Sequence, residues 1–156
     1  MSKSLARVRA ALAAANLPNE IREMPDSTRT AAEAAAAAGC EIDQIAKSIL
    51  FAGEESGALY LFLTAGGNQV DPAKASTAAG EPLTRADGKA VREITGFAIG
   101  GVAPIGHLTA PRAFLDPRLT EFSTVWAAAG TPRHIFEIAP RDMARLSGAR
   151  EVPFTS

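Results

Sequence analysis

Two apolar runs joined by a short, glycine-bounded turn constrain the fold of this chain more than any other feature. The runs cover residues 45–51 and 58–64, and Gly53-Glu54-Glu55-Ser56-Gly57 lies between them. Apolar runs of this length with glycine at their ends are typical of strands, and so short a connection joins antiparallel neighbours. We therefore expect a hairpin of two central strands.

Turn and capping signals divide the rest of the chain into short helices and strands. Asp71-Pro72 and the Thr30-to-Glu33 capping box are typical helix starts. The predicted helices cover residues 4–15, 30–38, 71–80, 87–94 and 140–146, and the further predicted strands cover residues 20–24, 97–100, 113–115, 124–128 and 134–138. This alternation predicts a fold of the α+β or mixed α/β class, with a mixed, largely antiparallel, curled sheet surrounded by helices.

Length and charge limit the classes of function. A chain of 156 residues fits a single domain, residues 1–156, and no repeat or linker divides it. Lys and Arg number 16 and Asp and Glu 17, which gives a net charge of −1 and no broad basic field for nucleic acid. Contact with a nucleic acid must then be local.

The metal-binding and membrane classes find little support in the residues. Cys40 is the single cysteine and there are two histidines, so no disulfide framework and no metal cluster is expected, and a reducing, cytoplasmic location fits best. Residues 94–111 lack charged side chains but carry four glycines and two prolines, which is unlike a membrane helix. We expect no metal, no cofactor and no membrane association.

Lys47 is the first candidate functional residue. It stands in the middle of the apolar run at residues 45–51, where strand alternation puts it on the same face as Ile45 and Ile49. One interpretation is an edge strand whose lysine reaches water. The other is a cation at the mouth of a pocket, where it would hold a phosphate or a developing oxyanion.

The second candidate is the glycine-rich segment at residues 100–107. Its order matches neither a dinucleotide-binding loop nor a P-loop. Glycines let backbone N–H groups approach a ligand closely, so Gly100 and Gly101 are candidates for binding a negative oxygen. Pro104 would stiffen the turn, and His107 could bind ligand or polarise water. The alternative is an ordinary tight connection within the sheet. Cys40 and His134 are interpreted as structural.

Three segments of the chain together resemble the YbaK-type aminoacyl-tRNA deacylases, the free-standing relatives of the editing domain of bacterial prolyl-tRNA synthetases. The segments are Lys47 within Ile-Ala-Lys-Ser-Ile-Leu-Phe, Asp71-Pro-Ala-Lys74-Ala, and the stretch from Ile94 through Gly-Gly-Val-Ala-Pro to His107. The resemblance extends over nearly the whole chain. Its most specific element is the Gly-x-x-x-Pro segment downstream of a strand lysine.

The resemblance implies a mixed α/β editing domain that hydrolyses the ester of a mischarged tRNA in trans. The substrate would be proline tRNA carrying a small amino acid such as cysteine, alanine or 2-aminobutyrate, bound by its acceptor end, and an aminoacyl-tRNA synthetase is a possible partner. Lys47 and Gly101 would match the catalytic positions. The substrate-binding positions would be Phe97, Gly100, Val102, Ala103, Pro104 and His107. Phe97 stands where relatives often have tyrosine, so a hydroxyl is missing there.

Two other classes of function stay open at this point. The chain could be a non-catalytic module that binds an aminoacyl-tRNA end or an adenylate and works with a synthetase, since the same lysine and loop would serve. It could also be a protein-interaction domain in which the glycine segment is a plain turn. Catalytic turnover separates the first alternative from an enzyme, and unchanged ligand affinity after Lys47→Ala would favour the second.

Overall fold

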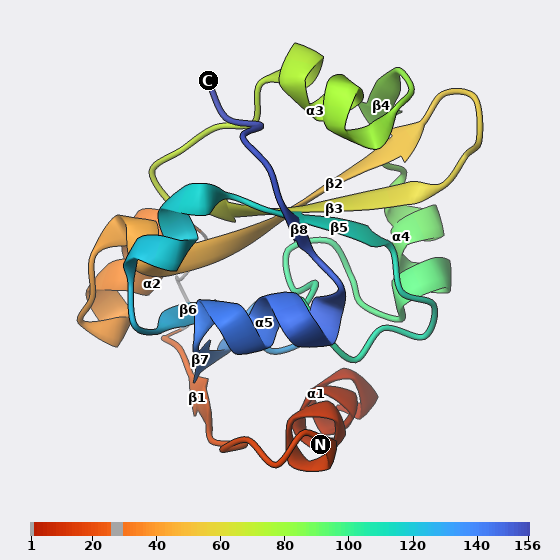
Figure 1. Ribbon diagram of the computed structural model, residues 1–156. Coiled ribbons are helices and arrows are strands. Elements are labelled where there is room, and N and C mark those ends of the chain that lie inside the picture. Colours follow the sequence, from red (N-terminus) through yellow and green to blue (C-terminus); the bar gives the residue numbers. More distant parts are fainter. Residues whose placement is uncertain (1, 26–29) are drawn as a thin grey trace.

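The computed structural model describes residues 2–25 and 30–156, which are built around one sheet of eight strands (Figure 1). The strands are β1 (Ile21–Glu23), β2 (Ile45–Gly53), β3 (Leu59–Ala65), β4 (Leu83–Arg85), β5 (Arg112–Leu115), β6 (Val125–Ala128), β7 (His134–Ile138) and β8 (Arg150–Glu151). The α-helices are α1 (Lys3–Ala14), α2 (Ala31–Ala38), α3 (Pro72–Ala79), α4 (Gly88–Thr95) and α5 (Pro140–Ser147), and the 3-10 helices are η1 (Ile42–Gln44) and η2 (Pro117–Glu121).

The sheet is mixed, as the sequence predicts. Its strand order is β1-β7-β6-β2-β3-β5-β8, and β4 pairs with β2 beside this path. The pairs β1·β7, β2·β3, β2·β4 and β6·β7 are antiparallel, whereas β2·β6, β3·β5 and β5·β8 are parallel. The predicted hairpin is confirmed, with Lys47 opposite Thr64 and Phe51 opposite Tyr60 in its register.

Both faces of the central strand β3 are covered, which explains its unbroken apolar sequence. All seven residues of β3 are buried. Leu61 and Leu63 belong to the core that includes Val8 of α1, Val91 of α4 and Met143 of α5. The buried side chains beneath α3 and the C-terminal segment form the opposite core: Tyr60, Phe62, Ala75, Ala79, Phe114 and Phe154. Figure 1 shows α3 and the C-terminus on one side of the sheet and α1 and α5 on the other.

The helix starts confirm the capping signals of the sequence. Thr30 and Glu33 form a reciprocal capping box at the start of α2, and the Asp71 carboxylate accepts hydrogen bonds from the first turn of α3. Asp87 caps α4 in the same way. These side chains satisfy backbone N–H groups that have no partner within a helix, so the three boundaries follow from local sequence.

The strand predicted at residues 97–100 is wrong. Gly96 and Gly100 adopt φ angles of +82° and +97°, so the chain turns at both ends of this segment and cannot continue as a strand. Phe97 is instead fully buried in the core. The short strands β4 and β8 were not predicted. Each has only two or three residues, and its pairing depends on neighbours distant in sequence.

One edge of β2 is only partly paired, and this gap positions the candidate site. Strand β6 pairs with β2 at Ile45 and Ala46, and β4 pairs with β2 at residues 51–53. Between these two contacts, residues 47–50 have a strand neighbour on one side only, which is β3. Pairing of β6 with β2 ends at Ala46, so the edge of β2 beside Lys47 has no strand neighbour on that side.

Candidate functional site

A cleft of about 450 Å³ lies along the open edge of β2. Its volume is within the range of roughly 300–1,000 Å³ that is typical of small-molecule sites. Lys47 and Ser48 come from β2, Gly100 and Val102 come from the glycine segment, and Trp126 comes from β6. The fold therefore brings the strand lysine and part of the glycine segment, which are more than fifty positions apart in sequence, to one cleft.

A larger hollow of about 610 Å³, beside α1, β1 and α5, is less suited to an anionic ligand. Its lining includes three acidic residues, Glu20, Glu137 and Asp142, and one basic residue, Arg22, so negative charge is in excess. Those negative charges would repel a phosphate or an oxyanion, whereas the cleft at β2 contains a lysine. Charge therefore identifies the β2 cleft as the candidate site.

The Lys47 ammonium is held by a backbone carbonyl. Its Nζ donates a hydrogen bond to the carbonyl oxygen of Asn68, with 2.7 Å between the two atoms. Partial burial lowers the pKa of Lys47 below its ordinary value, and the negative charges of Asp116 and Asp43 act against that lowering. The side chain is neither free on an edge strand nor fully buried: its ammonium is oriented by the Asn68 carbonyl, and Lys47 is one of the residues that line the cleft.

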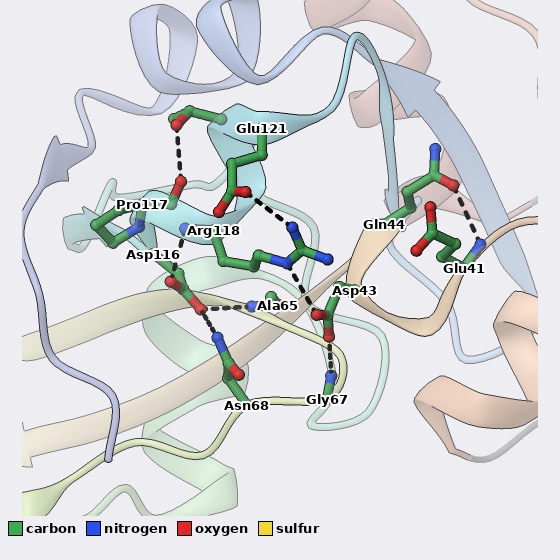
Figure 2. Close-up of polar contacts among 11 residues, drawn as sticks. Glu41, Asp43, Gln44, Ala65, Gly67, Asn68, Asp116, Pro117, Arg118 and Glu121 are labelled. Carbon is green, nitrogen blue, oxygen red and sulfur yellow. Dashed lines mark hydrogen bonds and ion pairs between the residues drawn. The ribbon is translucent and has the colours of Figure 1, made fainter.

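The loop that carries this carbonyl is fastened by two carboxylates (Figure 2). We name residues 65–68 the β3 loop. Asp116 accepts hydrogen bonds from the Ala65 N–H at 3.0 Å and from the Asn68 side chain at 2.9 Å. Asp43 accepts one from the Gly67 N–H at 2.8 Å and pairs with Arg118 at 2.9 Å. Asp43 and Asp116 thus fix the segment that contacts Lys47.

The glycine segment contributes backbone to the cleft, but its glycines differ in role. Gly101 donates its N–H to the Ala98 carbonyl, and a Cβ at Gly101 would lie 2.6 Å from the backbone of Thr131. Gly100 and Val102 border the cleft, and among the described residues no backbone partner is found for their N–H groups. The N–H groups of Gly100 and Val102 are therefore candidates for binding a ligand, as is that of Ile99, which also lines the cleft and has no backbone partner among the described residues.

The other residues of this region that were predicted to bind substrate do not line the cleft. Phe97, Ala103 and Pro104 are buried and do not line the cleft. His107 does not line it either: its Nε2 lies 2.7 Å from the Ala103 carbonyl oxygen, and its ring packs edge-on against Phe97. Burial lowers the pKa of His107 below its ordinary value, which favours the neutral ring.

An arginine of the N-terminal helix holds the chain at two points, one just before the glycine segment and one near its end. Arg7 donates to the Gly96 carbonyl at 2.7 Å and to the Gly106 carbonyl at 3.3 Å, and its guanidinium lies over the Phe97 ring. Helix α1 therefore contributes to the shape of the cleft without lining it at this point.

Sequence reasoning missed the opposite wall of the cleft. Thr131 and His134 line it, and the Thr131 Oγ1 lies 2.6 Å from the His134 Nδ1. It also missed the carboxylates that hold the β3 loop, because Asp116-Pro117 reads as an ordinary turn. The signal that could have found Thr131 is the Gly130-Thr131-Pro132 turn directly before a strand, since loop residues at strand ends often form sites.

The described residues contain neither a cluster of metal-ligating side chains nor a membrane-spanning helix. No group of three or more His, Cys, Asp or Glu side chains in residues 2–25 and 30–156 is arranged to hold a metal ion. In the same part of the chain, no helix has the length and apolar character needed to cross a membrane.

Comparisons with known proteins agree on the kind of domain. Residues 25–146 match the family model of the aminoacyl-tRNA editing domain. The uncharacterized protein YwhH of Bacillus subtilis is 33% identical over 144 residues, which cover 92% of this chain and 91% of that protein.

Solved structures give the same result. A structure described as a candidate trans-editing enzyme for prolyl tRNA synthetase is 46% identical, with a TM-score of 0.92 and coverage of 100% of this chain and 99% of that chain. The structure of a hypothetical protein is 26% identical, with a TM-score of 0.86 and coverage of 96% and 99%. With a family model that matches most of its length, the chain belongs to the aminoacyl-tRNA editing domain family.

Proposed function

We propose that this protein is a free-standing deacylase that hydrolyses the ester of a mischarged aminoacyl-tRNA. The observation that carries the proposal is one cleft lined by Lys47, Gly100 and Val102, where the lysine ammonium is held by a backbone carbonyl and the two N–H groups have no backbone partner among the described residues. These are a cation and neutral donors on a fixed backbone, which is the equipment for stabilising a negative oxygen.

Ester hydrolysis needs such stabilisation at one stage. When the oxygen of water attacks the carbonyl carbon, the C=O electrons move to the carbonyl oxygen and create an oxyanion. The bond from that carbon to the ribose oxygen then breaks, the ribose oxygen takes a proton, and a free amino acid and an uncharged tRNA result. Donors fixed at the oxyanion stabilise this transition state more than the ground state. In this mechanism Gly100 and Val102 donate to the oxyanion, and Lys47 orients the carbonyl or the terminal phosphate.

In this mechanism Gly101 does not donate a hydrogen bond to the oxyanion, although the resemblance to the deacylases assigns it a catalytic position. Its N–H is already bonded to the Ala98 carbonyl, and its missing side chain lets the segment pack on Thr131 and Pro132. It therefore sets the position of the N–H groups on either side, Gly100 and Val102, instead of donating itself.

The substrate we propose is proline tRNA that carries a small amino acid, such as alanine, cysteine or 2-aminobutyrate, bound by its acceptor end. The likeness to the candidate trans-editing enzyme for prolyl tRNA synthetase supports this choice. A net charge of −1 also favours contact with the acceptor end alone, because a broad contact with tRNA phosphates would require a basic face. A synthetase that delivers the tRNA is a fitting partner.

The test is a deacylation assay with a panel of charged tRNAs. Proline tRNA charged with alanine, cysteine or 2-aminobutyrate is compared with correctly charged proline tRNA and with alanine tRNA charged with alanine. We expect amino acid release well above the uncatalysed rate for at least one mischarged proline tRNA, and little for correctly charged proline tRNA. Tight binding of every tRNA without release would contradict the proposal and favour a non-catalytic binding module.

A further inference from the structure

The position of the Lys47 ammonium depends on the carbonyl that accepts its hydrogen bond, and the inference drawn from this contact rests on the proposed function. The lysine ammonium donates to the Asn68 carbonyl, which belongs to the β3 loop. A loop carbonyl is a good acceptor for a catalytic cation only if the loop itself holds one position, because a misplacement of about 1 Å can reduce a rate by about 100-fold.

Asp116 is built to hold that position. It is 2% exposed and accepts hydrogen bonds from three donors: the Ala65 N–H, the Asn68 side-chain amide and the Arg118 N–H, at 3.0, 2.9 and 3.0 Å. The first two bonds hold both ends of the β3 loop. Asp116 is buried, uses three of about four acceptor positions on the protein itself and does not line the cleft, so we do not assign it a contact with substrate.

Asp43 holds the middle of the same loop from the opposite direction. Its carboxylate accepts the Gly67 N–H and pairs with Arg118, which also pairs with Glu121. Figure 2 shows Asp43 and Asp116 on two sides of the β3 loop, with Arg118 beside both. The side-chain bonds lower the pKa of Asp43, so it is ionised at neutral pH.

We propose that Asp116, assisted by Asp43, is a positioning residue for Lys47. It fixes the Asn68 carbonyl that aims the ammonium, through its hydrogen bonds with the Ala65 N–H and the Asn68 side chain. Neither carboxylate is a catalytic residue, because each acts on the substrate only through the lysine.

The charged groups around Lys47 give the proposal a pH signature. Asp43 faces the ammonium from η1, Asp116 faces it from the end of β5, Arg118 lies behind Asp43, and His134 shares the cleft. Burial already lowers the pKa of Lys47, and the two carboxylates oppose that effect. If the Asp116 charge is removed, the pKa of Lys47 falls further, and the ammonium is lost at a lower pH.

The experiment combines kinetics with a direct titration of Lys47. For Asp116→Asn we expect kcat to fall about tenfold while KM stays within about twofold, because the aim of the ammonium is lost and the cleft is kept. The alkaline limb of the kcat profile should move to lower pH. An NMR titration of the Lys47 side chain, assigned by its absence in Lys47→Ala, should show a lower pKa than in the parent protein.

Two further variants separate position from charge. Asn68→Ala removes one tie of the loop but keeps both carboxylates, so kcat should fall while the alkaline limb stays in place. Glu121→Gln, which contacts Arg118 but not the loop, is the matched control and should change neither quantity. If Asp116→Asn fails to fold, Asn68→Ala and Asp43→Asn carry the test, since both positions are only partly buried.

The outcomes distinguish this inference from the proposed function. A Lys47 pKa that is the same in the parent, Asp116→Asn and Asp43→Asn would overturn the inference even if the protein is a deacylase. Loss of activity by the same factor at every pH in Asp116→Asn would also overturn the charge effect. If no charged tRNA is hydrolysed, the proposed function fails, yet a lowered Lys47 pKa in Asp116→Asn would still support the arrangement.

Discussion

The two ends of the β2–β3 hairpin are fastened by the same chemistry but serve different purposes. At the turn end, the Glu81 carboxylate accepts hydrogen bonds from the N–H groups of Glu55 and Ser56, from the Ser56 hydroxyl and from the Tyr60 hydroxyl. These donors lower the pKa of Glu81 to about 2. They close the turn, and no group bordering the cleft depends on them.

At the other end, Asp116 and Asp43 hold the β3 loop in a comparable way, but the loop has one further contact. Its Asn68 carbonyl accepts the Lys47 ammonium at the cleft. A carboxylate that holds a turn is therefore not itself a sign of function. The two ends differ in the next contact: only at one end does the loop contact a residue that lines the cleft, Lys47, to which we assign the proposed function.

The largest expected effect is the loss of the lysine itself. Lys47→Ala should reduce deacylation by about 100-fold or more, which is the scale of one oriented electrostatic contact at a transition state. The melting temperature should change little, because an ammonium whose pKa is lowered by burial adds little to stability.

The matched control is Lys74→Ala. Lys74 also donates its ammonium to a backbone carbonyl, that of Thr155 at 3.0 Å, but it lies on α3 away from the cleft. This variant should retain full activity. An equal loss of deacylation activity in Lys47→Ala and Lys74→Ala would mean that the loss does not depend on the cleft, which would contradict the role proposed for Lys47.

Two glycine variants compare the glycine segment of the cleft with the turn end of the hairpin. In Gly101→Ala the new methyl would lie 2.6 Å from the Thr131 backbone, which cannot move cheaply, so we expect a loss of about 1–3 kcal/mol in unfolding free energy and lower activity. In Gly53→Ala the methyl would overlap the Glu81 carboxylate and push it away from the donors of the turn, so stability should fall here as well, whereas activity should be unchanged because no residue of the cleft is affected. Urea unfolding and the deacylation assay measure both.

If Gly101→Ala changes neither the stability nor the activity, the glycine segment and the residue 130–132 turn are not packed as described. Normal stability together with lost activity would instead favour direct contact of Gly101 with the substrate.

Much of the fold could be predicted from the sequence because its signals are local. The hairpin, the capping box at Thr30 and the Asp71-Pro72 helix start each depend on residues within a few positions of one another, and each is confirmed. The strand predicted at residues 97–100 failed because two glycines with positive φ angles flank it. A pattern of apolar residues does not reveal the sign of a φ angle.

The candidate site was only partly predictable, for a different reason. Lys47 could be singled out because a charged side chain is rarely buried within an apolar strand without a partner. The glycine segment could be singled out because four glycines lie within eleven residues there. Asp116 gave no such signal, since an Asp-Pro pair is common in turns. Its role depends on contacts with Ala65 and Asn68, about fifty positions away, which only the pairing of β3 with β5 brings together.

The glycine segment and the turn end of the hairpin should lose stability in acid at different pH values. His107 supports the glycine segment as a buried ring with a lowered pKa, so the unfolded chain binds its proton first as the pH falls through about 6.5. The parent protein should lose unfolding free energy between about pH 7 and pH 5, at no more than about 1.4 kcal/mol per pH unit from this group. His107→Gln should lose less over that range. An identical pH dependence would show that His107 is not held as a neutral ring.

The smallest expected effect is at the turn end. Because the pKa of Glu81 is lower in the folded protein than in the unfolded chain, its stabilisation is full above about pH 4.5 and is lost as the pH falls through about 2. Glu81→Gln should therefore unfold at a slightly lower urea concentration than the parent at pH 7, and the two proteins should converge as the pH approaches 2. The difference should be small, since solvent screens a carboxylate at this surface position.

Deacylation at pH 7 should be the same in both. A Glu81→Gln variant that lost activity in proportion to Asp116→Asn would mean that the hairpin transmits its turn geometry along the β2–β3 ladder to Lys47, and the two ends would then act as one unit.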